Sequence, residues 1–260
     1  MTLISPSIPA PVPTPYNPPV PKQKPAVKIV HGRDSKGPVV SISVTHQQAD
    51  IRIKKDANNN VVAFINGKPY PLNIPNSDLS TLNITTGRYR DHVRIDDNVK
   101  VYAYIETGSG DDFVKTGGGK ATVEAGPGDD HVQLGTGGGL VRGGLGNDKM
   151  FGGTGHSTLH GDDGENYFST DIPKYSPKGT AIYSSGTEDT IRAAAGNVDI
   201  TVYSGKTNIE VDKSVSPNVR LYGGSGRSNI TVDSPSEESN VKILGQKKNA
   251  NFIYKRNALP

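Results

Sequence analysis

Residues 107–169 read TGSGDDFVK TGGGKATVE AGPGDDHVQ LGTGGGLVR GGLGNDKMF GGTGHSTLH GDDGENYFS when divided into consecutive nines. The fourth place is always glycine, from Gly110 to Gly164, and the second place is glycine in six of the seven nines. The eighth place is always apolar, and its residues are Val114, Val123, Val132, Val141, Met150, Leu159 and Phe168. A period held over seven units predicts a solenoid, because a single unit cannot bury its apolar residue and a stack can.

Each nine predicts six turn residues, in which two glycines take backbone angles closed to other residues, and then a three-residue strand whose middle side chain points inward. We expect two nines to make one coil of eighteen residues. We therefore expect an all-β fold, a right-handed parallel β-roll or β-helix solenoid. An N-terminal antiparallel β meander is expected to cap it, preceded by a disordered, proline-rich tail.

The motif GGxGxDxUx, with U apolar, strongly resembles the RTX (haemolysin-type) calcium-binding nonapeptide repeat, and this resemblance covers residues 107–169. The resemblance implies that calcium ions lie between the turns of adjacent coils. It further implies that turn carbonyls and the aspartate at place six hold them, as suits a hard cation with six or more oxygen ligands.

Carboxylates occupy place six in alternate nines only. From the first nine to the last, place six holds Asp112, Ala121, Asp130, Gly139, Asp148, Ser157 and Asn166. All the aspartates therefore fall on one edge of the solenoid. We expect one row of about two or three calcium ions there, between Asp112 and Asp130, between Asp130 and Asp148, and between Asp148 and the last turn.

Asparagine at place six leaves the last turn without its carboxylate. Asp163 or Glu165 could replace the carboxylate missing at Asn166, which itself remains a candidate ligand. Asp111 and Asp129, at place five, are expected to face solvent and to contribute charge rather than to ligate. The alternative interpretation is a calcium-free glycine solenoid in which the aspartates only cap their own turns.

Less regular coils are expected on both sides of the block. Residues 86–93 align with residues 107–114 at a spacing of 21, which places Asp91 above Asp112 as a further candidate ligand. After the block, turns around Asp189, Asn208 and Asn229 recur about every 19 to 22 residues. We interpret asparagine as the replacement for aspartate in these later turns. Stacked asparagines bond along the axis without charge repulsion, so these coils are expected to need no metal.

The predicted domain organisation has three parts. Residues 1–25 contain nine prolines and no charge before Lys22, which predicts an extended, disordered tail; its start is similar to type III secretion signals and is not a Sec signal peptide. Residues 26–85 alternate with period two and predict the β meander cap. Residues 86–254 predict the β-solenoid.

Composition limits the function classes. The 260 residues include no cysteine, and no apolar run approaches the length of a membrane helix. The net charge of +3 combines −5 in residues 107–169 with +8 elsewhere. His156 and His160 are four residues apart but lack the glutamate of an HExxH zinc site.

Two functions remain open. The first is a secreted calcium-binding solenoid of a bacterium, a type III effector or a surface-acting interaction protein that is not an enzyme. The second is a calcium-dependent carbohydrate-active enzyme such as a polysaccharide lyase. We expect a monomer whose partners are calcium ions and a host or surface molecule, without specific nucleic-acid binding. Membrane contact by the basic C-terminus is a weaker alternative.

Overall fold

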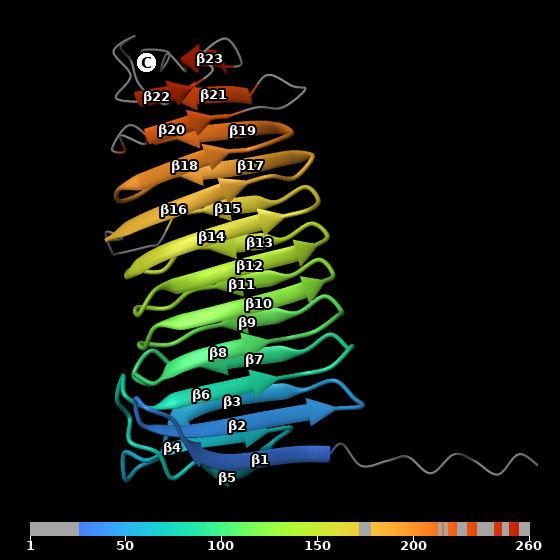
Figure 1. The fold of residues 1–260 in the computed structure, drawn as a ribbon, viewed down its shortest axis with the longest axis vertical. Coiled ribbons are helices and arrows are strands. Elements are labelled where there is room, and N and C mark those ends of the chain that lie inside the picture. Colours follow the sequence, from blue (N-terminus) through green and yellow to red (C-terminus); the bar gives the residue numbers. More distant parts are fainter. Residues whose placement is uncertain are drawn as a thin grey trace, which may run out of the picture.

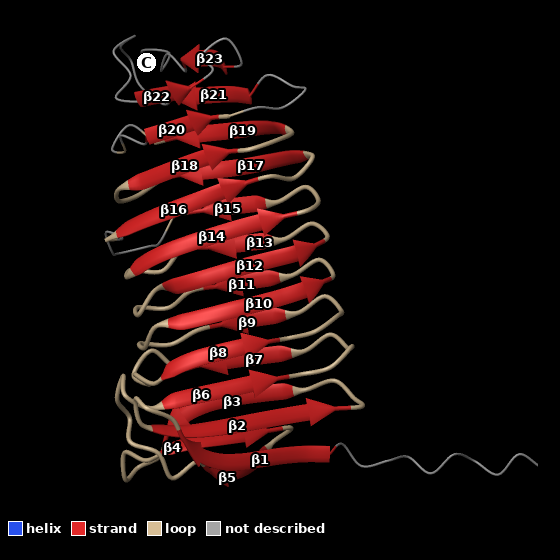
Figure 2. Ribbon diagram, in the orientation of Figure 1, coloured by secondary structure: helices blue, strands red, loops and turns tan. Residues whose placement is uncertain are grey.

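The computed structural model describes residues 26–171, 178–212, 215, 218–222, 228–232, 242–245 and 250–254. The proline-rich segment 1–25, expected to be a disordered tail, lies outside these residues. So does most of the basic C-terminus. Every regular element in the described ranges is a strand (Figure 2), and none of the described residues form a helix that could span a membrane.

Two sheets face each other along the length of the molecule (Figure 1). The first sheet has eleven described strands, which in spatial order are β1 (Ala26–Arg33), β2 (Pro38–Thr45), β6 (Thr81–Thr85), β8 (Tyr102–Glu106), β10 (Ala121–Pro127), β12 (Gly139–Leu145), β14 (His156–Asp162), β16 (Gly179–Ser184), β18 (Val198–Val202), β20 (Asn218–Leu221) and β22 (Lys242–Gly245). We call it sheet A.

The second sheet, sheet B, has twelve described strands. In the same direction along the axis these are β5 (Lys68–Pro71), β4 (Val61–Ile65), β3 (Asp50–Lys55), β7 (His92–Ile95), β9 (Phe113–Lys115), β11 (His131–Gln133), β13 (Lys149–Phe151), β15 (Tyr167–Ser169), β17 (Glu188–Ala193), β19 (Lys206–Val211), β21 (Ser228–Val232) and β23 (Ala250–Tyr254).

The chain alternates between the sheets and forms a right-handed coil. In Figure 1 the strands of sheet A from β2 onward run left to right in front, the strands of sheet B from β7 onward return behind them, and the chain climbs by one strand spacing per coil. Parallel pairing connects equivalent strands, such as β10 with β12 and β11 with β13. The predicted parallel solenoid is therefore confirmed.

Antiparallel strands close the N-terminal end, also as predicted. Strand β1 pairs with β2, and β4 lies between β3 and β5, all in antiparallel register. Parallel stacking begins earlier than the expected boundary at residue 86, because β2 already pairs with β6 and β3 with β7. The antiparallel cap is thus β1, β4 and β5, and the remaining strands of 26–85 belong to the first coils. The cap therefore places β1 and β5, rather than the coil strands β2 and β3, at the N-terminal edges of the two sheets.

The core is two facing columns of apolar side chains. The eighth-place residues are all buried with 0 % exposure, as predicted, and the columns continue through Ile191, Ile209 and Ile230 in sheet B and through Ile182, Ile200 and Val219 in sheet A. Burial of each such side chain stabilises the fold by about 1.5–3 kcal/mol. Since each column is built from one residue per coil, stability is distributed along the axis and depends on nearest neighbours.

The two sheets differ in strand length, which the repeat did not predict. Strands β9, β11, β13 and β15 have three residues, whereas β10, β12 and β14 have seven. In sheet A the parallel pairing continues into the expected turn, where Gly126 pairs with Gly144 and Pro127 with Leu145. The turn after sheet A is therefore short, and it is this turn that carries the aspartates.

Candidate calcium site

The turns that follow sheet A form the right-hand edge of the molecule in Figure 1. Within the repeats they connect β8 to β9, β10 to β11, β12 to β13 and β14 to β15. Each turn ends on the place-six residue immediately before the sheet B strand. The parallel stacking of sheet B sets these residues directly above one another, one per coil.

Six residues at this position, four in the repeats and two in the flanking coils, form a continuous hydrogen-bonded column, which we call the inner ladder. Its members are Asp91, Asp112, Asp130, Asp148, Asn166 and Asp189, none more than 2 % exposed. Each backbone N–H donates to Oδ1 of the next member, with distances in chain order of 2.6, 2.7, 2.9, 3.0 and 2.8 Å. The Oδ1 atoms thereby fix the register of successive turns.

The second carboxylate oxygen distinguishes the repeats from the flanking coils. Among the described residues, Oδ2 of Asp112, of Asp130 and of Asp148 is buried and has no hydrogen-bond partner. Oδ2 of Asp91 accepts from the Gly87 N–H at 3.2 Å. Burying a carboxylate oxygen without a hydrogen-bond partner is costly. Asp112, Asp130 and Asp148 are therefore suited to a cation, whereas the second oxygen of Asp91 is satisfied by the protein.

Asp189 closes the ladder with the most complete set of partners. Its Oδ2 accepts from Ser184 Oγ at 2.6 Å and from the Gly186 N–H at 3.3 Å. Sequence reasoning did not include Asp189 in the carboxylate row. The spacing from Asn166 to Asp189 is 23, five residues more than a regular coil. Counting back two positions from the inward Ile191 would have revealed it.

Burial and mutual repulsion shift the acidity of the three aspartates. Burial raises the pKa of Asp130 to about 8, and the negative charges of Asp148 and Asp112 add to the increase. Burial also raises the pKa of Asp112 and that of Asp148, each to about 6. Without a cation, the centre of the ladder therefore holds a proton near neutral pH.

Backbone carbonyls of adjacent turns approach the same edge. At Gly128 φ is +144°, and an added Cβ would lie 2.2 Å from the Gly110 carbonyl oxygen one coil earlier. An added Cβ at Gly143 would lie 2.1 Å from Oδ2 of Asp148 and 2.9 Å from the Gly161 carbonyl oxygen. Asp162, the one exception at place two, keeps the required left-handed geometry with φ +59°. Glycine thus leaves room for carboxylate and carbonyl oxygens to converge, as a hard cation requires.

A second column runs along the outside of the same turns. This outer ladder consists of the exposed place-five residues Asp111, Asp129, Asn147 and Glu165. Here each later N–H donates to Oδ1 of the earlier residue, at 3.1, 2.8 and 2.8 Å, so its bonds run opposite to those of the inner ladder. Asp111 and Asp129 face solvent as expected, and they also support the turn.

The remaining predicted ligands are placed as follows. Asn166 is in the inner ladder, and its Nδ2 donates to the Asp163 carbonyl at 3.4 Å. The side chain of Asp163 is exposed and outside the ladder; it borders a surface hollow of about 430 Å³ with Gly186 and Thr187. Within the described ranges, no three His, Asp or Glu side chains converge to hold a metal by themselves.

The later asparagines bond to one another along the axis as expected, but their predicted position in the turn was wrong. Thr207, not Asn208, aligns with Asp189, and its Oγ1 lies 2.9 Å from Ser184 Oγ inside the coil. Asn208 and Asn229 occupy the next, outward position, where Nδ2 of Asn229 donates to Oδ1 of Asn208 at 2.9 Å. Place six lies two positions before the inward apolar residue of each coil. Asn208 and Asn229 lie only one position before the inward Ile209 and Ile230, so they are not at place six.

Comparison with protein families agrees with this geometry. Residues 104–132 and 142–172 match the RTX calcium-binding nonapeptide repeat, in four copies. The chain carries RTX repeats. The matched residues include Asp112, Asp130 and Asp148, whose Oδ2 atoms have no hydrogen-bond partner among the described residues. No curated protein and no solved structure matches the chain.

Proposed function

We propose that the protein binds a short row of calcium ions along the RTX turn edge, with Asp112, Asp130 and Asp148 as the carboxylate ligands. The observation that supports this proposal is that Oδ2 of each is buried without a partner. Turn carbonyls such as that of Gly161 would supply further oxygens. The flanking members Asp91 and Asp189 are satisfied by N–H and hydroxyl donors and act as metal-free ends of the row.

Calcium would supply the positive charge that three closely stacked carboxylates need. Because the ligands must be ionised, binding displaces the proton held near Asp130 and links metal affinity to folding free energy. The antiparallel cap precedes the repeats, and the parallel coils from β16 to β19 follow them. Calcium therefore acts on a segment of the solenoid rather than on its ends.

The biological role follows from where calcium is abundant. We propose a secreted calcium-binding β-solenoid of a bacterium, an effector or surface-acting protein whose repeats are completed outside the low-calcium cytosol. RTX repeats at 104–172 support this role. We further propose that the protein binds rather than catalyses. Measuring export in strains that each lack one secretion system tests the proposed secretion. A reducing-end assay on polyuronates tests whether the protein is an enzyme.

Calorimetric calcium titration of matched variants tests the metal site. Asp130→Asn keeps Oδ1 for the ladder but puts an amide in place of Oδ2, and we expect calcium affinity to fall at least tenfold. Asp129→Asn removes the same charge from the exposed outer ladder one residue away and is the control; its affinity should change less than threefold. Equal losses in the two variants would mean that net charge alone is being measured and would refute the assigned ligands.

A further inference from the structure

Three cations lie in line on the outward face of sheet B, away from the calcium edge. Arg52 of β3 is in register with Arg94 of β7, which is in register with Lys115 of β9. Neighbouring strands are about 4.8 Å apart, so like charges directly opposite one another repel. Such a column needs compensation from the protein or from a ligand.

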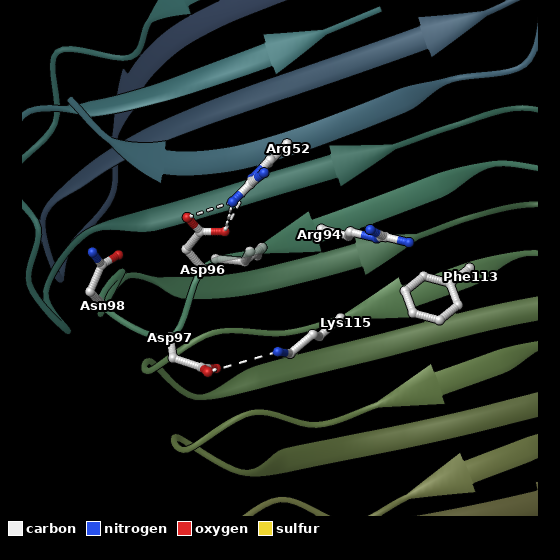
Figure 3. Close-up of a pocket in the computed structure, with 8 residues that line it drawn as sticks. Arg52, Arg94, Asp96, Asp97, Asn98, Phe113 and Lys115 are labelled. Atoms are coloured by element: carbon white, nitrogen blue, oxygen red, sulfur yellow. Dashed lines mark hydrogen bonds and ion pairs between the residues drawn. The ribbon is translucent and has the colours of Figure 1, made fainter.

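The turn after β7 compensates the two outer cations. Arg52 makes three contacts of 3.2–3.3 Å with the Asp96 carboxylate, and Lys115 Nζ lies 3.8 Å from Asp97 (Figure 3). The central cation, Arg94, has no carboxylate partner in the described part of the chain. Its guanidinium lies instead over the Phe113 ring, 4.9 Å from the ring centroid. The ring holds the guanidinium in place without satisfying its N–H donors.

These residues line an open hollow of about 690 Å³, a size common for ligand sites. In Figure 3, Arg52, Arg94 and Lys115 come from successive strands, with Asp96, Asp97 and Asn98 along one side. An arginine fork with free donors matches the two oxygens of a carboxylate or sulfate. Because Arg94 is already positioned by Phe113, less side-chain entropy is lost when such a group binds.

A row of rings extends from this hollow along the axis. Phe113 stacks on His131 at 5.1 Å, His131 on Phe151 at 4.9 Å, and Phe151 packs against Tyr167 at 5.9 Å. Single-stranded nucleic acids are usually bound by stacking bases on free aromatic faces. Here Arg94 lies over the Phe113 ring, and the facing sides of Phe113, His131 and Phe151 cover one another. The stacked rings therefore leave mainly their edges for contact with a ligand. A polymer on this face is recognised through its anionic groups rather than through bases.

We propose that sheet B binds an acidic glycan, with a carboxylate or sulfate group of one sugar held by Arg94 between Arg52 and Lys115. The glycan would run along the ring edges toward Lys149 of β13. The site does not use the calcium ligands, so it is independent of the proposed calcium function. It would give a secreted solenoid a surface for acidic polysaccharide.

Binding of fluorescent oligosaccharides, measured with saturating calcium so that the repeats stay intact, tests the proposal. The probes are an oligogalacturonate, a sulfated heparin fragment of equal length, a neutral malto-oligosaccharide, oligodeoxythymidine and inorganic phosphate. Arg94→Gln removes the central fork, and Arg142→Gln makes the same change at an exposed residue of β12 on the opposite sheet. Phe113→Leu keeps Arg94 but removes the ring beneath it. Thermal unfolding of each variant checks that it remains folded.

We expect at least one acidic glycan to bind, the neutral one not to bind, and Arg94→Gln to weaken binding about tenfold or more while Arg142→Gln leaves it within twofold. Phe113→Leu should give an intermediate loss. Comparison of the two acidic probes shows whether carboxylate or sulfate is preferred. Equal effects of Arg94→Gln and Arg142→Gln, tighter binding of oligodeoxythymidine, or phosphate binding as tightly as either glycan would each overturn the proposal.

Discussion

The backbone N–H of Asp112 donates to Oδ1 of Asp130 at 2.7 Å, one coil away, while Oδ2 of Asp130 has no partner among the described residues. The two oxygens of one carboxylate thus have separate tasks. Oδ1 fixes the register of the turns, and Oδ2 remains available to a cation. Substitutions that remove one oxygen or both should therefore have different consequences.

Asp130→Asn and Asp130→Ala should differ in metal-free stability. Asparagine keeps the Oδ1 acceptor and removes a carboxylate whose ionised form is disfavoured by burial, so at pH 8 in chelator its free energy of unfolding should equal or exceed that of the wild type. Alanine leaves the Asp112 N–H without an acceptor and should cost about 1–3 kcal/mol. Urea unfolding in chelator measures both. A stability loss in Asp130→Asn as large as in Asp130→Ala would show that Oδ1 does not hold the register.

Metal-free stability should fall as pH rises from about 4 to about 8. The pKa of Asp130 is raised to about 8 in the folded chain, so across this range the folded chain holds a proton that the unfolded chain has released. Raising the pH therefore favours unfolding. Asp112 and Asp148, each raised to about 6, add to the fall between about pH 4 and 6.

Melting temperatures at pH 5.5 and 8 in chelator measure this dependence. Asp130→Asn should show a smaller change than the wild type, and saturating calcium should weaken or reverse the fall because the bound state is ionised. A wild-type melting temperature that rises with pH in chelator would contradict the protonated state of the ladder.

Calcium stoichiometry should follow the unpartnered oxygens. Three buried Oδ2 atoms predict about three ions per chain. Asn166→Asp would extend this set by one carboxylate and should add about one ion. Equilibrium dialysis with metal analysis gives both numbers. Six or seven tightly bound ions in the wild type would mean that the edge with Ala121, Gly139 and Ser157 also binds calcium.

Chelation should loosen the solenoid locally. Hydrogen exchange resolved by peptide should show lost protection over residues 107–169, where the unpartnered carboxylates lie, and retained protection over 178–212. In the latter segment Ser184 satisfies Asp189, and Thr207 replaces a carboxylate with a hydroxyl. Protection lost evenly along the chain would mean that calcium controls the whole solenoid as one cooperative unit.

Turn glycines should be more sensitive than strand glycines. Gly128→Ala forces a Cβ to within 2.2 Å of the Gly110 carbonyl at a φ of +144°, and should cost about 2 kcal/mol or more. Gly32→Ala in β1, where nothing lies within 4 Å of an added Cβ, is the control and should change stability by less than about 1 kcal/mol. Comparable losses at both positions in chemical unfolding would argue against the stacked turns.

The regular repeat was sufficient to predict the stack, its inward column and the alignment of Asp112, Asp130 and Asp148. All three features depend on the nine-residue period, which is visible in the sequence of residues 107–169. The longer strands of sheet A were not predicted, because pairing such as Pro127 with Leu145 depends on hydrogen bonds between coils rather than on side-chain type. The early start of parallel pairing at β2 was missed for the same reason, since period two does not distinguish parallel from antiparallel neighbours.

Outside the repeat, spacing alone placed Asp91 correctly above Asp112 but gave the wrong residues in the later coils. Asn208 was interpreted as the replacement for aspartate from an approximate spacing, whereas the inward Ile209 places Thr207 in line with Asp189. The hollow between Arg52 and Lys115 was also invisible in the sequence. Its residues lie on three strands that are separated along the chain by a hairpin and by sheet A strands.

The alternation of aspartate and small residues at place six restricts how such a chain can change length. Inserting one nonapeptide would carry every later aspartate to the opposite edge, beside Ala121 and Gly139, and would break the ladder at the insertion. Inserting eighteen residues adds one intact rung, like the bond from Asp112 to Asp130 across a separation of 18. Insertions that keep the ladder intact therefore come in pairs of nonapeptides, and natural length variants should differ by whole pairs.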